Sequence, residues 1–181
     1  MTSLSVYHQS SADLPNKVLT HLEDIASTLA AVGVHFERWQ AVAPLVPGCS
    51  DEQVLAAYRP QIETLMSERG YAAVDVLSVS DEHPDKAELR ARCLGEQRQA
   101  EDQVRFFVVG SGLLSLHIDD YVYAVLCEKG DLVALPAGTR HWFDMGEHPH
   151  FVMIRLFSAA DAWAGELTGD EIASRFPRLD D

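Results

Sequence analysis

The chain has 181 residues, of which 47% are hydrophobic and 23% charged, a length and composition that suit one globular domain with a sizeable core. Its formal net charge of -14 at pH 7 disfavours nucleic acid and anionic membrane surfaces as partners, because both are bound through Lys and Arg. Residues 1–10 lack the features of a signal peptide, no apolar run approaches the ~20 residues that span a bilayer, and the three scattered cysteines favour reduced thiols, so we expect a cytoplasmic protein.

Residues 1–95 show mixed helix and strand signals. Apolar residues recur at helical spacing in residues 17–31, and Ser50 with Gln53 forms a capping box that opens a second helix. Gly33 and Gly70 follow these helices as stop signals. The resulting expectation is strands at residues 4–7, 34–39 and 71–79, and helices at residues 17–31, 51–69 and 85–94.

After residue 100 the pattern changes to short apolar or alternating runs separated by Gly, Asp and Pro. Closely spaced strands with turn residues between them predict an antiparallel barrel or jelly roll. The expected strands are residues 104–109, 113–118, 121–127, 132–135, 141–145 and 151–157. A short helix is expected within the tail, residues 168–179. The fold class is therefore mainly β with flanking helices, in a single domain. Residues 1–95 form its mixed α/β part, 96–160 carry the barrel motifs, and 161–181 form a C-terminal helix and tail.

The stretch from Gly130 to His141 reads G, five residues, P, one, G, two, H. Gly130 permits a tight turn, while Pro136 and Gly138 shape the next hairpin. His141 then begins a strand, where an imidazole can face a metal inside a barrel. A histidine beside Trp142 is also compatible with an ordinary core residue. This stretch resembles the second conserved motif of the cupin superfamily.

The first cupin motif reads H, one, H, three, E, six, G. In the matching stretch this chain keeps the spacing, with Gly110 in its place, but not the ligands. Glutamine stands at all three ligand positions: Gln97, Gln99 and Gln103.

Several longer blocks narrow the resemblance to the acireductone dioxygenase family. They lie at residues 102–107, 116–129, 141–146 and 168–179, and the N-terminal half agrees at residues 36–40 and 70–71. The resemblance covers nearly the whole chain. It implies a cupin barrel and an enzyme of methionine salvage that binds one Fe²⁺ or Ni²⁺ through three His and one Glu. With iron, the family converts acireductone and dioxygen to 4-methylthio-2-oxobutanoate and formate. With nickel, it forms a shorter acid, formate and carbon monoxide.

The resemblance places the family's metal ligands at Gln97, Gln99, Gln103 and His141, of which only His141 keeps its residue type. Amide oxygen suits iron and nickel poorly compared with imidazole, and Gln103 lacks the negative charge of Glu. Loss of even an outer-shell partner typically costs ~10–100-fold in metal affinity or activity. The sequence therefore predicts a degenerate metal site that binds metal weakly or not at all.

Neighbouring residues qualify this prediction. The resemblance implies that Arg105 and Phe143 contact the anionic substrate, and that Cys93 replaces a phenylalanine of the substrate pocket. Arg105 is also compatible with a buried ion pair to a nearby carboxylate.

Several carboxylates and histidines lie near these positions in the sequence and are possible substitute ligands. Strand alternation predicts that Glu96 and Asp102 face away from the three glutamines, and Glu101 is expected in a solvated turn. His148 and His150 are expected at the surface, whereas His117 can face either way.

Three functions remain open. The favoured one is a degenerate acireductone dioxygenase, inactive or severely impaired. The alternatives are an active dioxygenase with a rebuilt site that uses His141 and Glu101, and a metal-free cupin that binds a new small molecule. If the chain binds a partner, we expect acireductone or a related small acid, with no nucleic acid and no membrane, and a monomer is slightly favoured.

Overall fold

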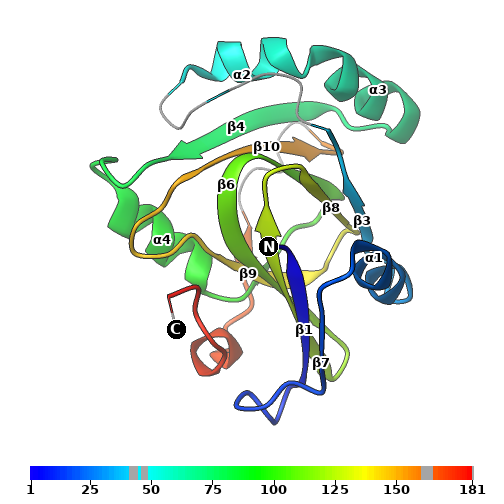
Figure 1. The fold of residues 1–181 in the computed structure, drawn as a ribbon, viewed down its shortest axis with the longest axis vertical. Coiled ribbons are helices and arrows are strands. Elements are labelled where there is room, and N and C mark those ends of the chain that lie inside the picture. Colours follow the sequence, from blue (N-terminus) through cyan, green and yellow to red (C-terminus); the bar gives the residue numbers. More distant parts are fainter. Residues whose placement is uncertain (41–44, 46–48, 160–164, 181) are drawn as a thin grey trace.

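The computed structural model describes residues 1–40, 45, 49–159 and 165–180. The described part contains eleven strands, four α-helices and one 3₁₀ helix (Figure 1). In chain order these are β1 (Ser3–His8), β2 (Lys17–Leu19), α1 (Leu22–Ala30), β3 (His35–Arg38), α2 (Asp51–Ala57), α3 (Arg59–Arg69), β4 (Ala73–Val79), α4 (Lys86–Leu94), β5 (Gln97–Arg98), β6 (Gln103–Ile118), β7 (Tyr121–Glu128), β8 (Asp131–Leu135), β9 (Arg140–Asp144), β10 (Phe151–Phe157), β11 (Glu166–Leu167) and η1 (Ile172–Arg175).

The strands form two antiparallel sheets that share the long strand β6. One sheet has the order β11-β5-β9-β6-β7-β1-β2, and the other has the order β4-β10-β6-β8-β3. Strand pairing among the described residues does not join the outer strands of the two sheets, so the expected barrel is not closed by hydrogen bonds. The mainly β, antiparallel architecture with flanking helices is confirmed.

Strand β6 joins what the sequence predicts as two strands, residues 104–109 and 113–118. Gly110 lies between them with φ +77°, and a Cβ there would lie 1.7 Å from the carbonyl oxygen of His150. Just before this point, the register with β10 shifts between Val152 and Met153, whose partners are Val109 and Phe107, so Val108 is the extra residue. The bulge at Val108, together with the left-handed Gly110, accompanies the passage of one continuous strand from the second sheet into the first.

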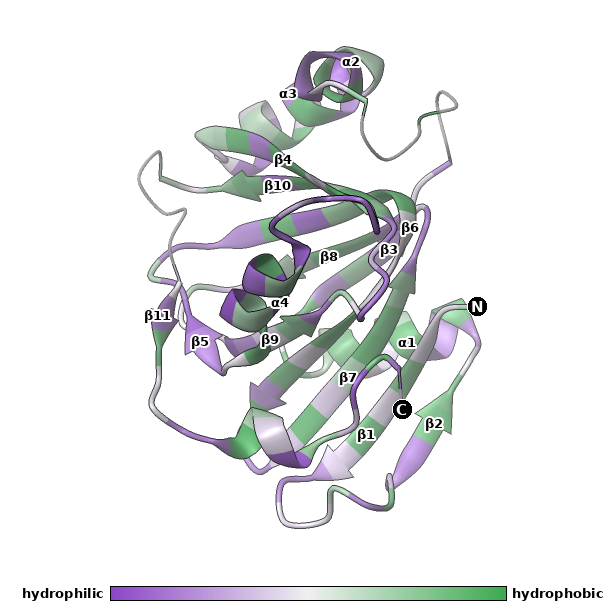
Figure 2. Cartoon of the chain, turned by 90° about the vertical axis from the view of Figure 1, so that its left-hand side faces the viewer, coloured by the Kyte–Doolittle hydropathy of each residue, from purple (hydrophilic) through white to green (hydrophobic). Residues whose placement is uncertain are grey.

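Alternate residues of β6 enter two different cores. Phe107 packs in the core that also contains Leu114, Leu116 and the α1 residues Ile25 and Leu29. Its neighbours Phe106 and Val108 instead pack in a second core with residues of α2 and α3, which lie along β4 in Figure 1. Because both faces of the strand are covered, β6 reads as a nearly continuous apolar run rather than an alternating one. On β1 and β7, by contrast, Figure 2 shows more polar and more apolar residues alternating along the strand.

Two predicted helices differ from the structure. Residues 17–19 form the edge strand β2, which pairs with β1 from Leu4 to Val6, so the helix begins only at Leu22. The predicted helix at residues 51–69 is divided at Tyr58 into α2 and α3. Pro60 has no N–H to donate to the preceding turn, which accounts for the break.

The predicted helix ends are confirmed. Ser50 and Gln53 form the reciprocal capping box of α2, and Gly70 ends α3 in the left-handed conformation. In the tail, the expected short helix is the single turn η1. No helix in the described ranges is long and apolar enough to cross a membrane.

Candidate functional site

The candidate site lies where the two sheets meet: Gln97 and His141 belong to the first sheet, Gln103 and Arg105 lie on the part of β6 that pairs with β8 and β10, and Gln99 follows β5 in a loop. Gln97 on β5 pairs directly with His141 on β9, and His141 pairs on its other side with Leu116 of β6. Directly paired residues project from the same face of a sheet. Gln97 and His141 therefore face the side on which Leu116 enters the core.

Arg105 connects Gln103 to His141. Its Nε donates to Oε1 of Gln103 at 3.2 Å, and its Nη2 lies 3.3 Å from Nε2 of His141. All three side chains are buried, with exposed fractions of 6% or less. The structure thus brings together three of the residues that the sequence predicted for this site.

The tautomer of His141 follows from its two contacts. Its Nδ1 lies 2.8 Å from the carbonyl oxygen of Thr139, which only accepts, so Nδ1 carries the proton. Nε2 is left to accept from Arg105. Burial, with the Arg105 charge as the second cause, lowers the pKa of His141 from 6.5 to about 3. The imidazole is therefore neutral at physiological pH.

Arg105 is a buried cation between neutral partners. Within the described part of the chain, no carboxylate forms a hydrogen bond or an ion pair with its guanidinium; Asp75, on the neighbouring strand pair, is bound by Arg155. Burial, and then the charge of Arg155, lowers the pKa of Arg105 to about 10. The buried ion pair that the sequence allowed at Arg105 is therefore not formed with any carboxylate in the described ranges.

Phe143 lies against the guanidinium, with the Arg105 Cζ atom 5.7 Å from the centre of its ring. The ring itself is buried and makes aromatic contacts with Phe107 and Phe151. Gly112 makes room for it, because a Cβ at that position would lie 2.3 Å from Phe143 Cζ. Phe143, which the resemblance assigns to the substrate pocket, thus packs beside the Arg105 guanidinium.

Gln97 and Gln99 occupy different surroundings. Gln97 packs against Gly165, where a Cβ would lie 1.9 Å from its Oε1. It also lines a cleft of about 520 Å³, together with Cys93, Leu77, Leu89, Leu167, Arg92, Arg155 and Gly165. Gln99 is buried, and its backbone carbonyl accepts from the N–H of Gly138 in the turn before His141. The segment with the glutamines therefore also supports the loop that positions His141.

Gln97, which belongs to the candidate site, and Cys93 both line this cleft. Burial raises the pKa of the Cys93 thiol, and the nearby charge of Arg105 opposes this shift. Arg155 lines the same cleft as Cys93 and Gln97. Sequence reasoning missed Arg155, although an arginine in the apolar run at residues 151–157 was a usable signal.

The other candidate ligands lie elsewhere. Glu96 is buried but faces His117, on the opposite side of β5 from Gln97, as strand alternation predicted. Glu101 is half-buried and accepts from Ser158, so it is not simply a solvated turn residue. Asp102, His148 and His150 are exposed.

The donor set does not fit the metal that the family uses. Three amides and one imidazole supply no negative charge to offset a dication. The imidazole nitrogen that faces the site already accepts from a guanidinium. A metal ion at His141 would have to displace Arg105 and would be repelled by its charge.

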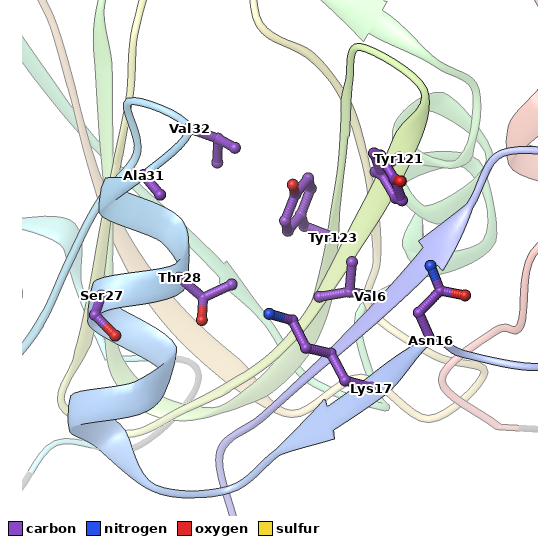
Figure 3. A pocket seen from close by; sticks show the side chains of 9 residues that line it. All are labelled: Val6, Asn16, Lys17, Ser27, Thr28, Ala31, Val32, Tyr121 and Tyr123. Atoms are coloured by element: carbon purple, nitrogen blue, oxygen red, sulfur yellow. The ribbon is translucent and has the colours of Figure 1, made fainter.

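A separate cleft of about 510 Å³ lies between α1 and the strands β1 and β2 (Figure 3). Tyr121 and Tyr123 of β7 form part of its wall, and Lys17 projects into it from β2. Its lining residues are distinct from those around Arg105 and His141, so it is not part of the candidate site.

Comparison with known proteins identifies the family of this chain. Residues 4–165 match the model of the ARD/ARD' family. Acireductone dioxygenase of Pseudomonas syringae pv. syringae (strain B728a) is 68% identical over 181 residues, which is 100% of both chains. That of Pseudomonas fluorescens (strain Pf0-1) is 65% identical over the same length, again with full coverage of both chains.

A solved structure of the same family shares the fold. Acireductone dioxygenase from Bacillus anthracis, with a cadmium ion in its active centre, superposes with a TM-score of 0.81 at 25% identity. The match covers 92% of this chain and 98% of that one. The cupin fold predicted from the sequence is confirmed, and the chain belongs to the acireductone dioxygenase family.

Proposed function

We propose that this chain is an acireductone dioxygenase of methionine salvage whose metal centre is degenerate, so that it is inactive or severely impaired in turning over acireductone. The observation that carries the proposal is the contact between Arg105 and His141. The one imidazole among the four family ligand positions accepts from a buried cation at 3.3 Å. We expect Fe²⁺ and Ni²⁺ to bind weakly or not at all.

Chemistry and electrostatics support the proposal independently. Replacing two imidazoles and a carboxylate by amides removes two basic nitrogens and one negative charge. The low pKa of His141, about 3, reflects a site that disfavours a second positive charge. A dication carries more charge than a proton, so the same environment opposes it more strongly.

The test is the metal content of two purified proteins. The chain as it stands and the variant Gln97→His/Gln99→His/Gln103→Glu are expressed with iron or nickel in the medium and analysed for bound metal. The expected result is near-zero metal in the first protein and one equivalent in the second. The single variant Gln103→Glu is the matched control, because it restores the charge without the imidazoles and is expected to pair with Arg105 instead of binding metal.

Stoichiometric metal in the unsubstituted chain would refute the proposal. Direct assay of the dioxygenase reaction would then test the rebuilt site with His141 and Glu101. The contact of Glu101 with Ser158, at 2.9 Å, does not direct it toward His141.

A second candidate function is metal-free binding of a small organic acid. The buried Arg105 forms no hydrogen bond or ion pair with a carboxylate among the described residues, and Gln97, one of the family ligand positions, lines a cleft with leucine walls. A short 2-oxo acid has a carboxylate for Arg105 and an apolar tail for Leu77 and Leu89. Arg105 and Phe143 are the proposed contacts. A cytoplasmic location, a monomeric state and the absence of nucleic-acid or membrane partners stay predictions.

A further inference from the structure

A second buried polar cluster lies on the opposite side of β5 from the candidate site. His117 Nδ1 and Glu96 Oε2 are 2.5 Å apart, and both side chains are at most 2% exposed. Thr168 donates its hydroxyl to Glu96 Oε1 at 2.7 Å, and the Thr168 N–H donates to the Glu96 carbonyl oxygen at 3.1 Å. The cluster therefore joins β6, the start of β5 and the segment after β11.

The cluster also reaches the N-terminal segment through Gln9. Its Oε1 lies 3.0 Å from His117 Nε2, and its Nε2 donates to Asp120 at 3.3 Å. The Asp120 carboxylate requires the amide nitrogen on its side, so the amide oxygen faces His117. His117 Nε2 is consequently a donor, and one further proton lies between Nδ1 and Glu96.

Strand β5 has few other attachments. It comprises only Gln97 and Arg98, with one pairing to β9 and two to β11. Such a short strand is weakly held by backbone pairing alone. Glu96 precedes it directly, so the bonds of Glu96 fix the point at which the strand enters the sheet.

We propose that Glu96 and His117 are positioning residues that hold β5 in register and thereby keep Gln97 facing the His141 side of the sheet. Successive residues of a strand project to opposite faces, so anchoring Glu96 on one face directs Gln97 to the other. Because a one-residue slip reverses every side chain of a strand, a buried anchor at residue 96 also guards against that error.

The same geometry argues against a cation site in this cluster. Ligand atoms of Glu96, His117 and Asp170 lie within 4.8 Å of one another. However, ligands of tetrahedral zinc, with bonds of about 2.0–2.1 Å, stand about 3.3 Å apart. The 2.5 Å separation of Glu96 and His117 is shorter, and both nitrogens of His117 and both carboxylate oxygens of Glu96 already have protein partners.

Hydrogen exchange in the unsubstituted background tests the proposal directly. The variant His117→Leu is expected to speed backbone exchange in residues 96–100 and 166–168 about tenfold or more, because a buried hydrogen bond to a charged group is lost. His117→Gln, which can still donate to Glu96, should show a smaller increase. An imidazole proton signal shifted far downfield is expected in the NMR spectrum of the parent and should disappear in Glu96→Gln.

Two control variants separate positioning from general destabilisation. His148→Gln removes an exposed His–carboxylate contact, with Asp81 at 3.1 Å, and should leave exchange unchanged. Leu65→Ala removes core packing of α3 and should not single out residues 96–100. Unchanged exchange of these residues in His117→Leu, or an increase matched by Leu65→Ala, would overturn the proposal.

A second experiment reads the consequence for the site and rests on the proposed function. In the Gln97→His/Gln99→His/Gln103→Glu background, adding His117→Leu is expected to weaken Co²⁺ binding ~10–100-fold, as for other residues that orient ligands. Adding Leu65→Ala should not, and equal Co²⁺ affinities with and without His117→Leu would count against positioning. If the restored parent binds no Co²⁺, the proposed function fails, while the exchange experiment still decides the role of His117.

Discussion

At the scale of single residues, the most consequential feature is a buried positive charge with neutral partners. Arg105 is 6% exposed and contacts Gln103, His141 and the ring of Phe143. A buried cation is costly unless an anion compensates it. Gln103 and His141, the hydrogen-bonded neighbours of Arg105, supply no compensating negative charge.

Arg105→Met is expected to have two effects. The pKa of His141 should rise above about 3, because the second cause of its depression is the Arg105 charge, and NMR titration of the imidazole measures this. Affinity for a short 2-oxo acid should fall about tenfold or more, because a charged hydrogen bond contributes about 1.5–3 kcal/mol. Arg92→Met, an exposed cleft residue paired with Glu88, is the control. An unchanged pKa of His141 in Arg105→Met would show that the Arg105 charge does not lower it.

Gly112 leaves the space that the Phe143 ring occupies beside Arg105. Gly112→Ala places a methyl group 2.3 Å from Phe143 Cζ in a buried setting, so unfolding free energy should fall by about 1–3 kcal/mol. Gly95→Ala is the matched comparison, since its nearest neighbour is the flexible end of Leu167 at 3.2 Å. Urea denaturation measures both, and equal losses would show that Phe143 can move aside.

At the scale of elements, β9 connects the candidate site to the C-terminal segment. Asp144 at its end is buried and accepts from Arg90 of α4 at 2.8 Å. It also accepts from the N–H groups of Gly146 and Leu179. One carboxylate thus joins a helix, a turn and the tail to β9, the strand that carries His141 and Phe143.

Asp144→Asn tests this fastening. Burial raises the pKa of Asp144, but the bonds from Arg90 and the two backbone N–H groups outweigh it, so the pKa lies below 3.8. A depressed pKa contributes stability that is complete above the unfolded value and is lost as pH falls through the folded value. Breaking a buried pair typically costs about 3–5 kcal/mol, so the variant should be much less stable at pH 7.

The pH dependence supplies the control for Asp144→Asn. The difference in unfolding free energy between the parent and the variant should shrink as pH falls below about 4. Urea denaturation at a series of pH values measures it. A difference that stays constant down to pH 2 would show that the carboxylate charge is not what stabilises the tail.

At the scale of the whole molecule, the fold does not depend on the metal site. Two extensive cores cover both faces of the shared strand β6, and Phe107 and Phe106 belong to different ones. Most of the stabilising burial therefore lies away from Gln97, Gln99 and Gln103.

Metal independence is measurable as a melting temperature. A chelator should leave the melting temperature of the unsubstituted chain unchanged. It should lower that of the restored triple variant, because a ligand at 100 times its Kd stabilises the folded state by about 2.7 kcal/mol. A chelator-induced decrease in the unsubstituted chain would reveal a metal that contributes to its stability.

Local signals in the sequence determined the types of many secondary-structure elements. The Ser50–Gln53 capping box, the stop at Gly70 and the short runs after residue 100 correctly predicted element types, since each depends on neighbouring residues. The spacing of Gln97, Gln99, Gln103 and His141 predicted a site, and the amide chemistry of glutamine predicted a poor fit to metal; the structure brings Gln103 and His141 together through Arg105.

Tertiary structure decided the rest, because the deciding contacts join distant parts of the chain. Residues 17–19 form a strand only because β1 lies beside them, and the apolar run of β6 continues through Gly110 because β10 accommodates the bulge. Likewise, the sequence offered a carboxylate partner for Arg105, whereas folding placed His141 there, 36 residues further along the chain. Burial then set the charge states of both side chains, since desolvation depends on what the whole fold packs around them.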